Sequence, residues 1–308
     1  MAALWILPAT ALIYFTVCLV IFKMAFGRQD DTSRAAIKES ESGPFKEFNY
    51  LNGIADKWLA DNNAKEVSIK SFDGYRLSGR FVAHESPRAT VVIVHGYHGN
   101  YTNSFALIFD LYKELGFNIL MFRQRAHSES EGKYITFGAL EHRDLLSWID
   151  FHNQTVGDLP LFVSGISMGA STVMYAADKE LPGNIRGMTA DCGFTSPYDI
   201  ILKVVSERIR MNAKFLMPGV NLFCKLLAGF DMKEFSSEKT LKNAKAPILM
   251  IHGEDDDFVP CEMSRRGFEA CSGEKYLVTV KGAAHGTSFL VGNERLRPML
   301  IEFFNSHL

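Results

Sequence analysis

Six short apolar runs alternate with longer helical segments along most of this 308-residue chain. The runs are TVVIVHG, FNILMFR, LFVSGIS, IRGMTADC, APILMIHG and KYLVTV. Apolar strands separated by helices are typical of a mostly parallel sheet that is covered by helices on both faces. The chain is therefore predicted to be an α/β protein, with its ligands beyond the carboxyl ends of the strands.

Composition narrows the function classes. The formal net charge of -2 gives no electrostatic reason to expect a nucleic-acid partner. The five cysteines are scattered and include no Cys-x-x-Cys pair. We expect free thiols, which are typical of a reducing compartment.

Residues 1–26 are predicted to form an N-terminal transmembrane anchor. The stretch from Leu4 to Phe22 has no charged residue, and nineteen helical residues span about 28 Å, close to the hydrocarbon thickness of a bilayer. An uncleaved or cleaved signal sequence is the alternative, because Ala25-Phe26-Gly27 resembles a small-x-small cleavage site. The positive-inside rule predicts a cytoplasmic domain, since four basic residues follow the span: Lys23, Arg28, Arg34 and Lys38.

The rest of the chain divides into a linker and one folded domain. Residues 27–44 are charged and Ser-rich, which predicts a polar linker, and residues 45–308 are predicted to form the domain. Alternating stretches at 66–72 and 75–83 flank Asp73-Gly74, a hairpin signal. Two helices predicted around 197–211 and 218–229 form an insertion at about 195–240, interpreted as a lid; ordinary packing layers are the alternative.

The motif Gly165-Ile166-Ser167-Met168-Gly169 is the strongest chemical signal. Ser167 directly follows an apolar run and precedes a good helix, so it is predicted to lie on a strand-to-helix turn that exposes its hydroxyl. Flanking glycines suit such a turn because it leaves no room for Cβ atoms. We interpret Ser167 as a nucleophile.

A serine nucleophile needs a base and an acid downstream. His285 lies past the final strand on a Gly- and Ala-rich loop and is the predicted base, whereas His252 is interpreted as a packed residue. The acid follows the preceding strand, where three candidates remain open: Asp255, Asp256 and Asp257.

The reaction also needs donors for an oxyanion. The backbone N–H of Met168 and that of Tyr97, in the loop VIVHGYHGN, are the predicted donors. His95 and His98 lack a third ligand nearby, so we predict no metal and no cofactor.

Taken together, these motifs resemble the serine hydrolases of the α/β-hydrolase superfamily. They are His95-Gly96, FRQRAHSESEG, GISMG, DCGFTSP, HGEDDDFVP and GAAHG. More narrowly, the chain is similar to bacterial membrane-anchored or cytosolic hydrolases of the prolyl-oligopeptidase-like and dienelactone-hydrolase-like branches. The resemblance implies a mostly parallel eight-stranded sheet with a small helical lid.

The resemblance also implies roles for individual residues. The family's Gly-x-x-Asp-x-x-Val-Pro pattern matches Gly253, Asp256, Val259 and Pro260, which selects Asp256 as the acid beside Ser167 and His285. It supports Tyr97 and Met168 as oxyanion donors. One departure is Ser128, where relatives usually have glycine.

The expected function is cleavage of a small-molecule or lipid-like carboxylic ester through an acyl-enzyme. Peptide or amide hydrolysis and acyl transfer are the enzymatic alternatives, because they use the same triad. A receptor or scaffold on the same fold is the non-catalytic alternative. Apolar residues of the predicted lid, Met211 to Phe230, either line an acyl pocket or pack onto the sheet.

Overall fold

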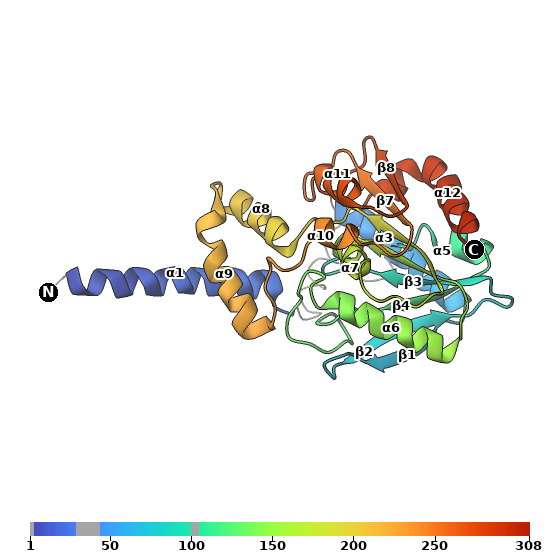
Figure 1. Ribbon diagram of the computed structural model, residues 1–308, viewed down its shortest axis with the longest axis horizontal. Helices are drawn as coiled ribbons and strands as arrows, with labels where there is room; N and C mark the ends of the chain where they lie inside the picture. Colours follow the sequence, from blue (N-terminus) through green and yellow to red (C-terminus); the bar gives the residue numbers. More distant parts are fainter. Residues whose placement is uncertain (1–2, 29–43, 100–104) are drawn as a thin grey trace.

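An eight-stranded, mostly parallel sheet forms the centre of the molecule (Figure 1). The computed structural model describes residues 3–28, 44–99 and 105–308. The sheet order is β1-β2-β4-β3-β5-β6-β7-β8, and only β1·β2 and β2·β4 are antiparallel. The strands are β1 Lys65–Lys70, β2 Arg76–Val82, β3 Ala89–Val94, β4 Phe117–Phe122, β5 Leu161–Ile166, β6 Ile185–Asp191, β7 Ile248–Gly253 and β8 Lys275–Val280.

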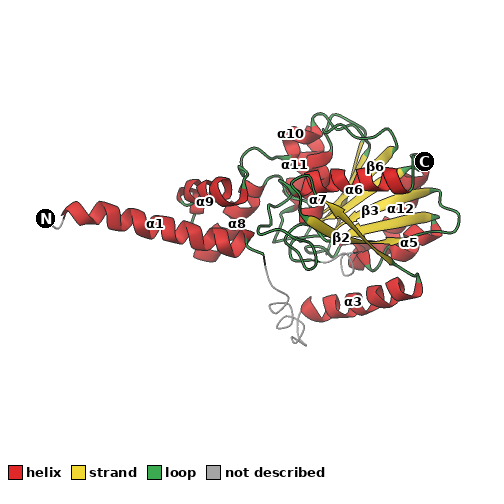
Figure 2. Ribbon diagram, turned by 90° about the horizontal axis from the view of Figure 1, so that it is seen from below, coloured by secondary structure: helices red, strands yellow, loops and turns green. Residues whose placement is uncertain are grey.

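Helices cover both faces of this sheet, as Figure 2 shows for α3 and α6. Successive residues of a strand point to opposite faces, so Val91 and Ile93 pack on one side of β3, and Val92 and Val94 on the other. The first side is covered by α3 (Pro44–Asp61), α5 (Phe109–Glu114) and α12 (Ser288–Ser306). The second is covered by α6 (Glu141–Thr155), α7 (Met168–Ala176), α10 (Ser237–Leu241) and α11 (Cys261–Ala270).

The α/β architecture predicted from the apolar runs is confirmed, with eight strands and helices on both faces. The predicted hairpin is confirmed as β1 and β2, and Gly74 in its turn has φ 93°, a conformation that favours glycine. All five cysteines are free, as predicted. Most of the predicted 27–44 linker lies outside the described residues.

Residues 195–240, called the insertion below, separate β6 from β7. They form α8 (Pro197–Ile209), a short turn (Ala213–Phe215), α9 (Met217–Phe223), a π-helical turn (Cys224–Ala228) and α10. The Ser196 hydroxyl caps α8 by accepting from the Asp199 N–H at 3.0 Å. In Figure 1, α8 and α9 lie at the end of the molecule from which α1 projects, away from α12.

The helix α1 (Ala3–Phe26) packs against the insertion through its second half. Cys18, Phe22 and Phe26 are completely buried there, whereas every residue from Leu7 to Ile13 is exposed. The helices approach closely because Gly219 has no side chain; a Cβ there would lie 2.5 Å from the Cys18 Sγ. The sequence pattern did not anticipate this contact.

One helix of the described chain, Leu7–Phe26, is long and apolar enough to cross a membrane, with a mean hydropathy of 2.0. A signal sequence and the core helix of a soluble protein meet the same criteria. The buried half of α1 is nonetheless part of the folded molecule, because the Tyr14 hydroxyl donates to the Phe215 carbonyl at 2.9 Å and accepts from the Gly219 N–H at 3.2 Å.

Phe26→Ala is expected to destabilise the domain by about 3–5 kcal/mol. The Phe26 ring packs against Phe137 and Phe230 at centroid distances of 5.2 and 5.9 Å, so truncation leaves a cavity. Chemical unfolding of the full chain in detergent measures the loss. Met24→Ala is the control, because Met24 is 68% exposed; an equal effect of the two substitutions would contradict this account.

Candidate active site

Ser167 lies on a sharp turn between β5 and α7, at the carboxyl edge of the sheet. Its backbone has φ 56° and ψ -119°, a conformation that a non-glycine residue adopts only under strain. The Ser167 N–H donates to the Asp191 carbonyl, at the end of the neighbouring strand, at 2.8 Å. This bond ties the turn to the sheet.

The glycines on both sides of Ser167 are required by space. A Cβ on Gly165 would lie 2.4 Å from the Gly169 carbonyl oxygen, and a Cβ on Gly169 would lie 2.0 Å from the Val94 carbonyl oxygen. Real Cβ contacts are never so short, so any side chain would displace the backbone of the turn or of β3. The sequence motif therefore reflects crowding around Ser167.

The structure brings Ser167, His285 and Asp256 into one hydrogen-bonded chain. The Ser167 Oγ lies 2.8 Å from the His285 Nε2, and the His285 Nδ1 lies 2.7 Å from the Asp256 Oδ2. A hydroxyl that donates to Nε2 and an Nδ1–H that donates to a carboxylate correspond to the neutral tautomer a general base requires. Phe258 packs edge-on against the imidazole, 5.0 Å between centroids.

Asp256 is the one buried member of the acidic run, since Asp255 and Asp257 are exposed. Burial raises the pKa of Asp256, but hydrogen bonds from His252, His285 and the Val259 N–H outweigh it and hold this pKa well below its usual range. The carboxylate is therefore ionised beside His285. It can stabilise a positive charge on the imidazole.

His252 supports the acid and is fully buried. Its Nδ1 lies 2.6 Å from the Ser264 hydroxyl, and its Nε2 lies 2.8 Å from the Val259 carbonyl and 3.3 Å from the Asp256 Oδ2. A carbonyl can only accept, so Nε2 carries the proton and Nδ1 accepts from Ser264. His252 thus braces the acidic loop and does not contact Ser167.

The potential metal ligands do not form an open site. In the described chain, Cys192, Asp256 and His285 place ligand atoms within 4.8 Å of one another. Asp256 and His285 already bond to each other, and burial raises the pKa of the Cys192 thiol, which disfavours the thiolate that binds metals. The His95 ring bonds to the Gly96 carbonyl at 2.8 Å and the Gln124 N–H at 3.0 Å, which uses both of its nitrogens.

Tyr97 and Met168, the predicted oxyanion donors, follow β3 and begin α7. The strand β3 pairs with β5, which precedes Ser167, and a Cβ on Gly96 would lie 3.2 Å from the Ser167 Cβ, so the loop after β3 runs beside Ser167. The Tyr97 hydroxyl donates to the Ala25 carbonyl of α1 at 2.8 Å, and its ring stacks on Phe137 at 4.9 Å. The role of the two N–H groups stays a prediction.

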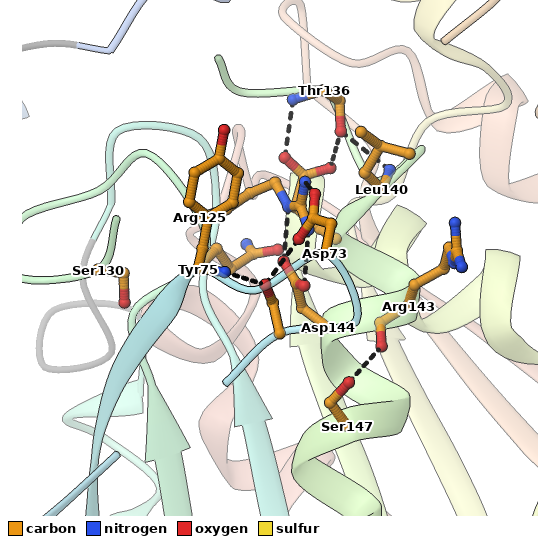
Figure 3. Close-up of polar contacts among 12 residues, drawn as sticks. Asp73, Tyr75, Arg125, Ser130, Thr136, Leu140, Arg143, Asp144 and Ser147 are labelled. Atoms are coloured by element: carbon orange, nitrogen blue, oxygen red, sulfur yellow. Dashed lines mark hydrogen bonds and ion pairs between the residues drawn. The ribbon is translucent and has the colours of Figure 1, made fainter. Parts of the chain in front are cut away.

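An ion-pair cluster centred on buried Arg125 and Asp144 lies close to the segment that supports Tyr97 (Figure 3). Arg125 donates to both Asp144 oxygens at 2.7 Å and to both Asp73 oxygens at 3.0 and 3.1 Å. Glu141 accepts from the Thr136 and Gly138 N–H groups at 2.7 and 2.9 Å. The Glu141 carboxylate therefore fixes the segment containing Phe137, on which Tyr97 stacks.

Sequence reasoning missed this cluster and also missed Asp191. Asp191 is buried at the carboxyl end of β6, and its Oδ1 accepts from the Ser288 hydroxyl at 2.9 Å. Its position at a strand end was the available signal. Ser128, the departure from the family pattern, has φ 44°, so a serine occupies a left-handed position that favours glycine.

Comparison with known proteins agrees with this architecture. Residues 85–222 match the family described as "Serine aminopeptidase, S33". The uncharacterized protein YqkD of Bacillus subtilis (strain 168) is 29% identical over 240 residues, covering 77% of this chain and 78% of YqkD. The lysophosphatidylserine lipase ABHD12 of Danio rerio is 23% identical over 223 residues, covering 69% of this chain and 54% of the lipase.

Solved structures show the same fold. The esterase Pf2001 of Pyrococcus furiosus superposes with a TM-score of 0.64 at 22% identity, covering 81% of this chain and 95% of the esterase. The chain therefore has the α/β-hydrolase fold, and residues 85–222 are similar to a family of hydrolases.

Asp191→Asn is expected to change how stability depends on pH. Burial raises the pKa of Asp191 from 3.8 to about 6, so between these values the folded protein holds a proton that the unfolded chain releases. The contribution of this proton to the free energy of unfolding is fully present below about pH 4. It is lost as the pH rises through 6, and the loss is up to about 3 kcal/mol. Asparagine never ionises and keeps an oxygen for Ser288.

Urea unfolding across this pH range should therefore show the wild type losing more stability than Asp191→Asn. Asp158→Asn is the control at an exposed carboxyl and should follow the wild type. Parallel pH curves for the wild type and Asp191→Asn would contradict the assignment.

Proposed function

We propose that the chain is a serine hydrolase that cleaves carboxylic esters through an acyl-enzyme, with Ser167, His285 and Asp256 as its triad. The observation that carries this proposal is the continuous hydrogen-bonded chain from the Ser167 Oγ to the Asp256 Oδ2. It lies at the carboxyl edge of the sheet, where such folds bind their substrates.

In the first half of the proposed reaction, the Ser167 Oγ attacks the ester carbonyl carbon while its proton passes to the His285 Nε2. Asp256 stabilises the imidazolium, and the N–H groups of Tyr97 and Met168 stabilise the oxyanion. As the tetrahedral intermediate collapses, the imidazolium gives this proton to the departing alkoxide. The products are an alcohol and acyl-Ser167.

In the second half, a water molecule attacks the acyl carbon and gives a proton to the His285 Nε2. Collapse of this second intermediate returns the proton to the Ser167 Oγ and releases the carboxylic acid. No cofactor takes part in this scheme, since the nucleophile, base and oxyanion donors come from the chain.

The relatives support hydrolysis, but they do not decide between an ester and a peptide as the bond that is cleaved. The esterase Pf2001 and the lysophosphatidylserine lipase favour an ester. The description "Serine aminopeptidase, S33" favours peptide hydrolysis as a second candidate. Assignment to the prolyl-oligopeptidase-like or dienelactone-hydrolase-like branch and acyl transfer to an alcohol remain predictions.

Ser167→Ala is expected to reduce kcat for p-nitrophenyl esters by a factor on the order of 10⁴ to 10⁶. Alanine keeps the turn but removes the nucleophile. The full chain in detergent is assayed with a series of acyl lengths, and with amide analogues for the second candidate. Ser147→Ala on α6 is the matched control; retained turnover in Ser167→Ala would refute the proposal.

We also propose that α1 anchors the protein in a membrane with the catalytic domain on the cytoplasmic side. The exposed apolar residues of α1 support the anchor, and the basic residues Arg28, Arg34 and Lys38 after it support the orientation. Protease added to intact cells should leave the domain uncut, while the same protease should digest it after permeabilisation. Digestion of the domain on intact cells would overturn the orientation. Recovery of the full chain in the soluble fraction of lysed cells would overturn the anchor.

A further inference from the structure

The insertion has an apolar surface that the folded domain does not cover. Met211, Phe215, Leu222, Leu226 and Leu227 are 59, 55, 40, 69 and 45% exposed. They fall within residues 208–228, called the insertion tip below. An apolar surface of this kind marks a contact with a partner or a membrane.

The insertion tip lies along α1. The Tyr14 hydroxyl bonds to the Phe215 carbonyl, the Cys18 Sγ to the Leu216 carbonyl at 3.5 Å, and Phe22 packs near Phe223 at 6.3 Å. The tip therefore follows α1 from Tyr14 toward its carboxyl end (Figure 1).

This contact constrains where the insertion tip lies if α1 crosses a membrane. The stretch that is long enough to cross, Leu7–Phe26, includes the residues that the tip covers. From Tyr14 to Phe26 a helix rises about 18 Å. Interfacial segments enter a bilayer by only about 5–10 Å. A bilayer that received the exposed stretch Leu7–Ile13 would therefore meet the apolar side of the tip near Tyr14, at its surface.

The charge of the insertion tip indicates how deeply the tip enters a bilayer and which lipid headgroups it contacts. Between Arg208 and Leu227 the chain has four basic residues and no acidic residue. Arg208, Arg210 and Lys214 are exposed. Long basic side chains extend toward lipid phosphates while nearby apolar side chains enter the acyl layer, which is the pattern of interfacial segments.

We propose that the insertion tip is seated in the interfacial layer of an anionic phospholipid leaflet, beside α1. Met211, Phe215, Leu222, Leu226 and Leu227 enter the acyl region. Arg208, Arg210 and Lys214 face the headgroups, whereas Lys225 is paired with Asp231 at 2.6 Å. This inference rests on the membrane anchor proposed above and extends it from a tether to a docking surface.

The seated insertion also connects the leaflet with the candidate active site. Lys203 of α8 donates to the Asp257 carbonyl at 2.6 Å, in the loop that carries Asp256. The insertion therefore contacts α1 at one end and the acidic loop at the other. Seating the tip in lipid therefore links the leaflet, through α8, to the loop that carries Asp256, which favours acyl esters that partition into membranes as substrates.

The test measures lipid contact at single labelled cysteines in the full chain. Cys261→Ser removes the one native cysteine that is not buried. Leu226→Cys is then labelled with an environment-sensitive fluorophore in vesicles of phosphatidylcholine and phosphatidylglycerol, with or without lipids brominated on their acyl chains. Leu12→Cys on α1 is the anchor control, matched at 69% exposure, and Val291→Cys on α12 is the aqueous control.

We expect brominated lipids to quench most of the fluorescence at Leu226 and Leu12 and none at Val291. Quenching at Leu12 without quenching at Leu226 would overturn this inference and leave the anchor standing. No quenching at Leu12 would overturn both the membrane anchor and the seating of the insertion tip in lipid. A shielded label at Leu226 that bromine does not quench would indicate a protein contact, such as a second copy, and would also overturn it.

The lipid charge and the route to the active site are tested separately. Quenching at Leu226 should weaken in vesicles of phosphatidylcholine alone; equal quenching would overturn the anionic assignment. Leu226→Ser with Leu227→Ser should slow turnover of a long-chain ester held in vesicles while leaving a soluble short-chain ester unchanged. Equal loss on both substrates would mean that these side chains support the fold, which contradicts a docking role.

Discussion

The crowded turn at Ser167 is the constraint on which the site depends. Gly165 and Gly169 leave no free space against the backbone of α7 and of β3, so β3, β5 and α7 must approach as closely as they do. The Ser167 N–H is also bonded to the last residue of β6. Three adjacent parallel strands therefore fix the position of one hydroxyl, and loops after β7 and β8 then need only reach it with Asp256 and His285.

The sequence predicts the central strands well because burial on both faces leaves a continuous apolar run in β3, β4, β5 and β7. Runs such as TVVIVHG have no polar face, and each became a strand flanked by helices. The turn at Ser167 was predictable for the same local reason, since small residues around it reflect steric need. The choice among Asp255, Asp256 and Asp257 was not local; it required the family pattern, and in the structure only Asp256 is buried.

Contacts between distant segments were not predictable from pattern. Arg125 lies after β4, Asp73 in the turn between β1 and β2, and Asp144 on α6. A charged residue in a sequence is normally read as exposed, whereas Arg125 and Asp144 are buried. The apolar stretch at the start of the chain looked complete as a membrane helix, because apolarity alone does not distinguish a lipid contact from a protein contact. The sequence signal of the close packing of α1 on the insertion is Gly219, where a Cβ would lie 2.5 Å from the Cys18 Sγ.

The bond from the Tyr97 hydroxyl to the Ala25 carbonyl has a consequence for how the protein is dissected. The acceptor belongs to the apolar helix α1, which is usually removed to obtain a soluble domain. A version of the protein cut after α1 would keep Ser167, His285 and Asp256 and lose the acceptor that orients the Tyr97 side chain. Kinetic constants from such a fragment would describe an active-site loop that the intact protein does not have.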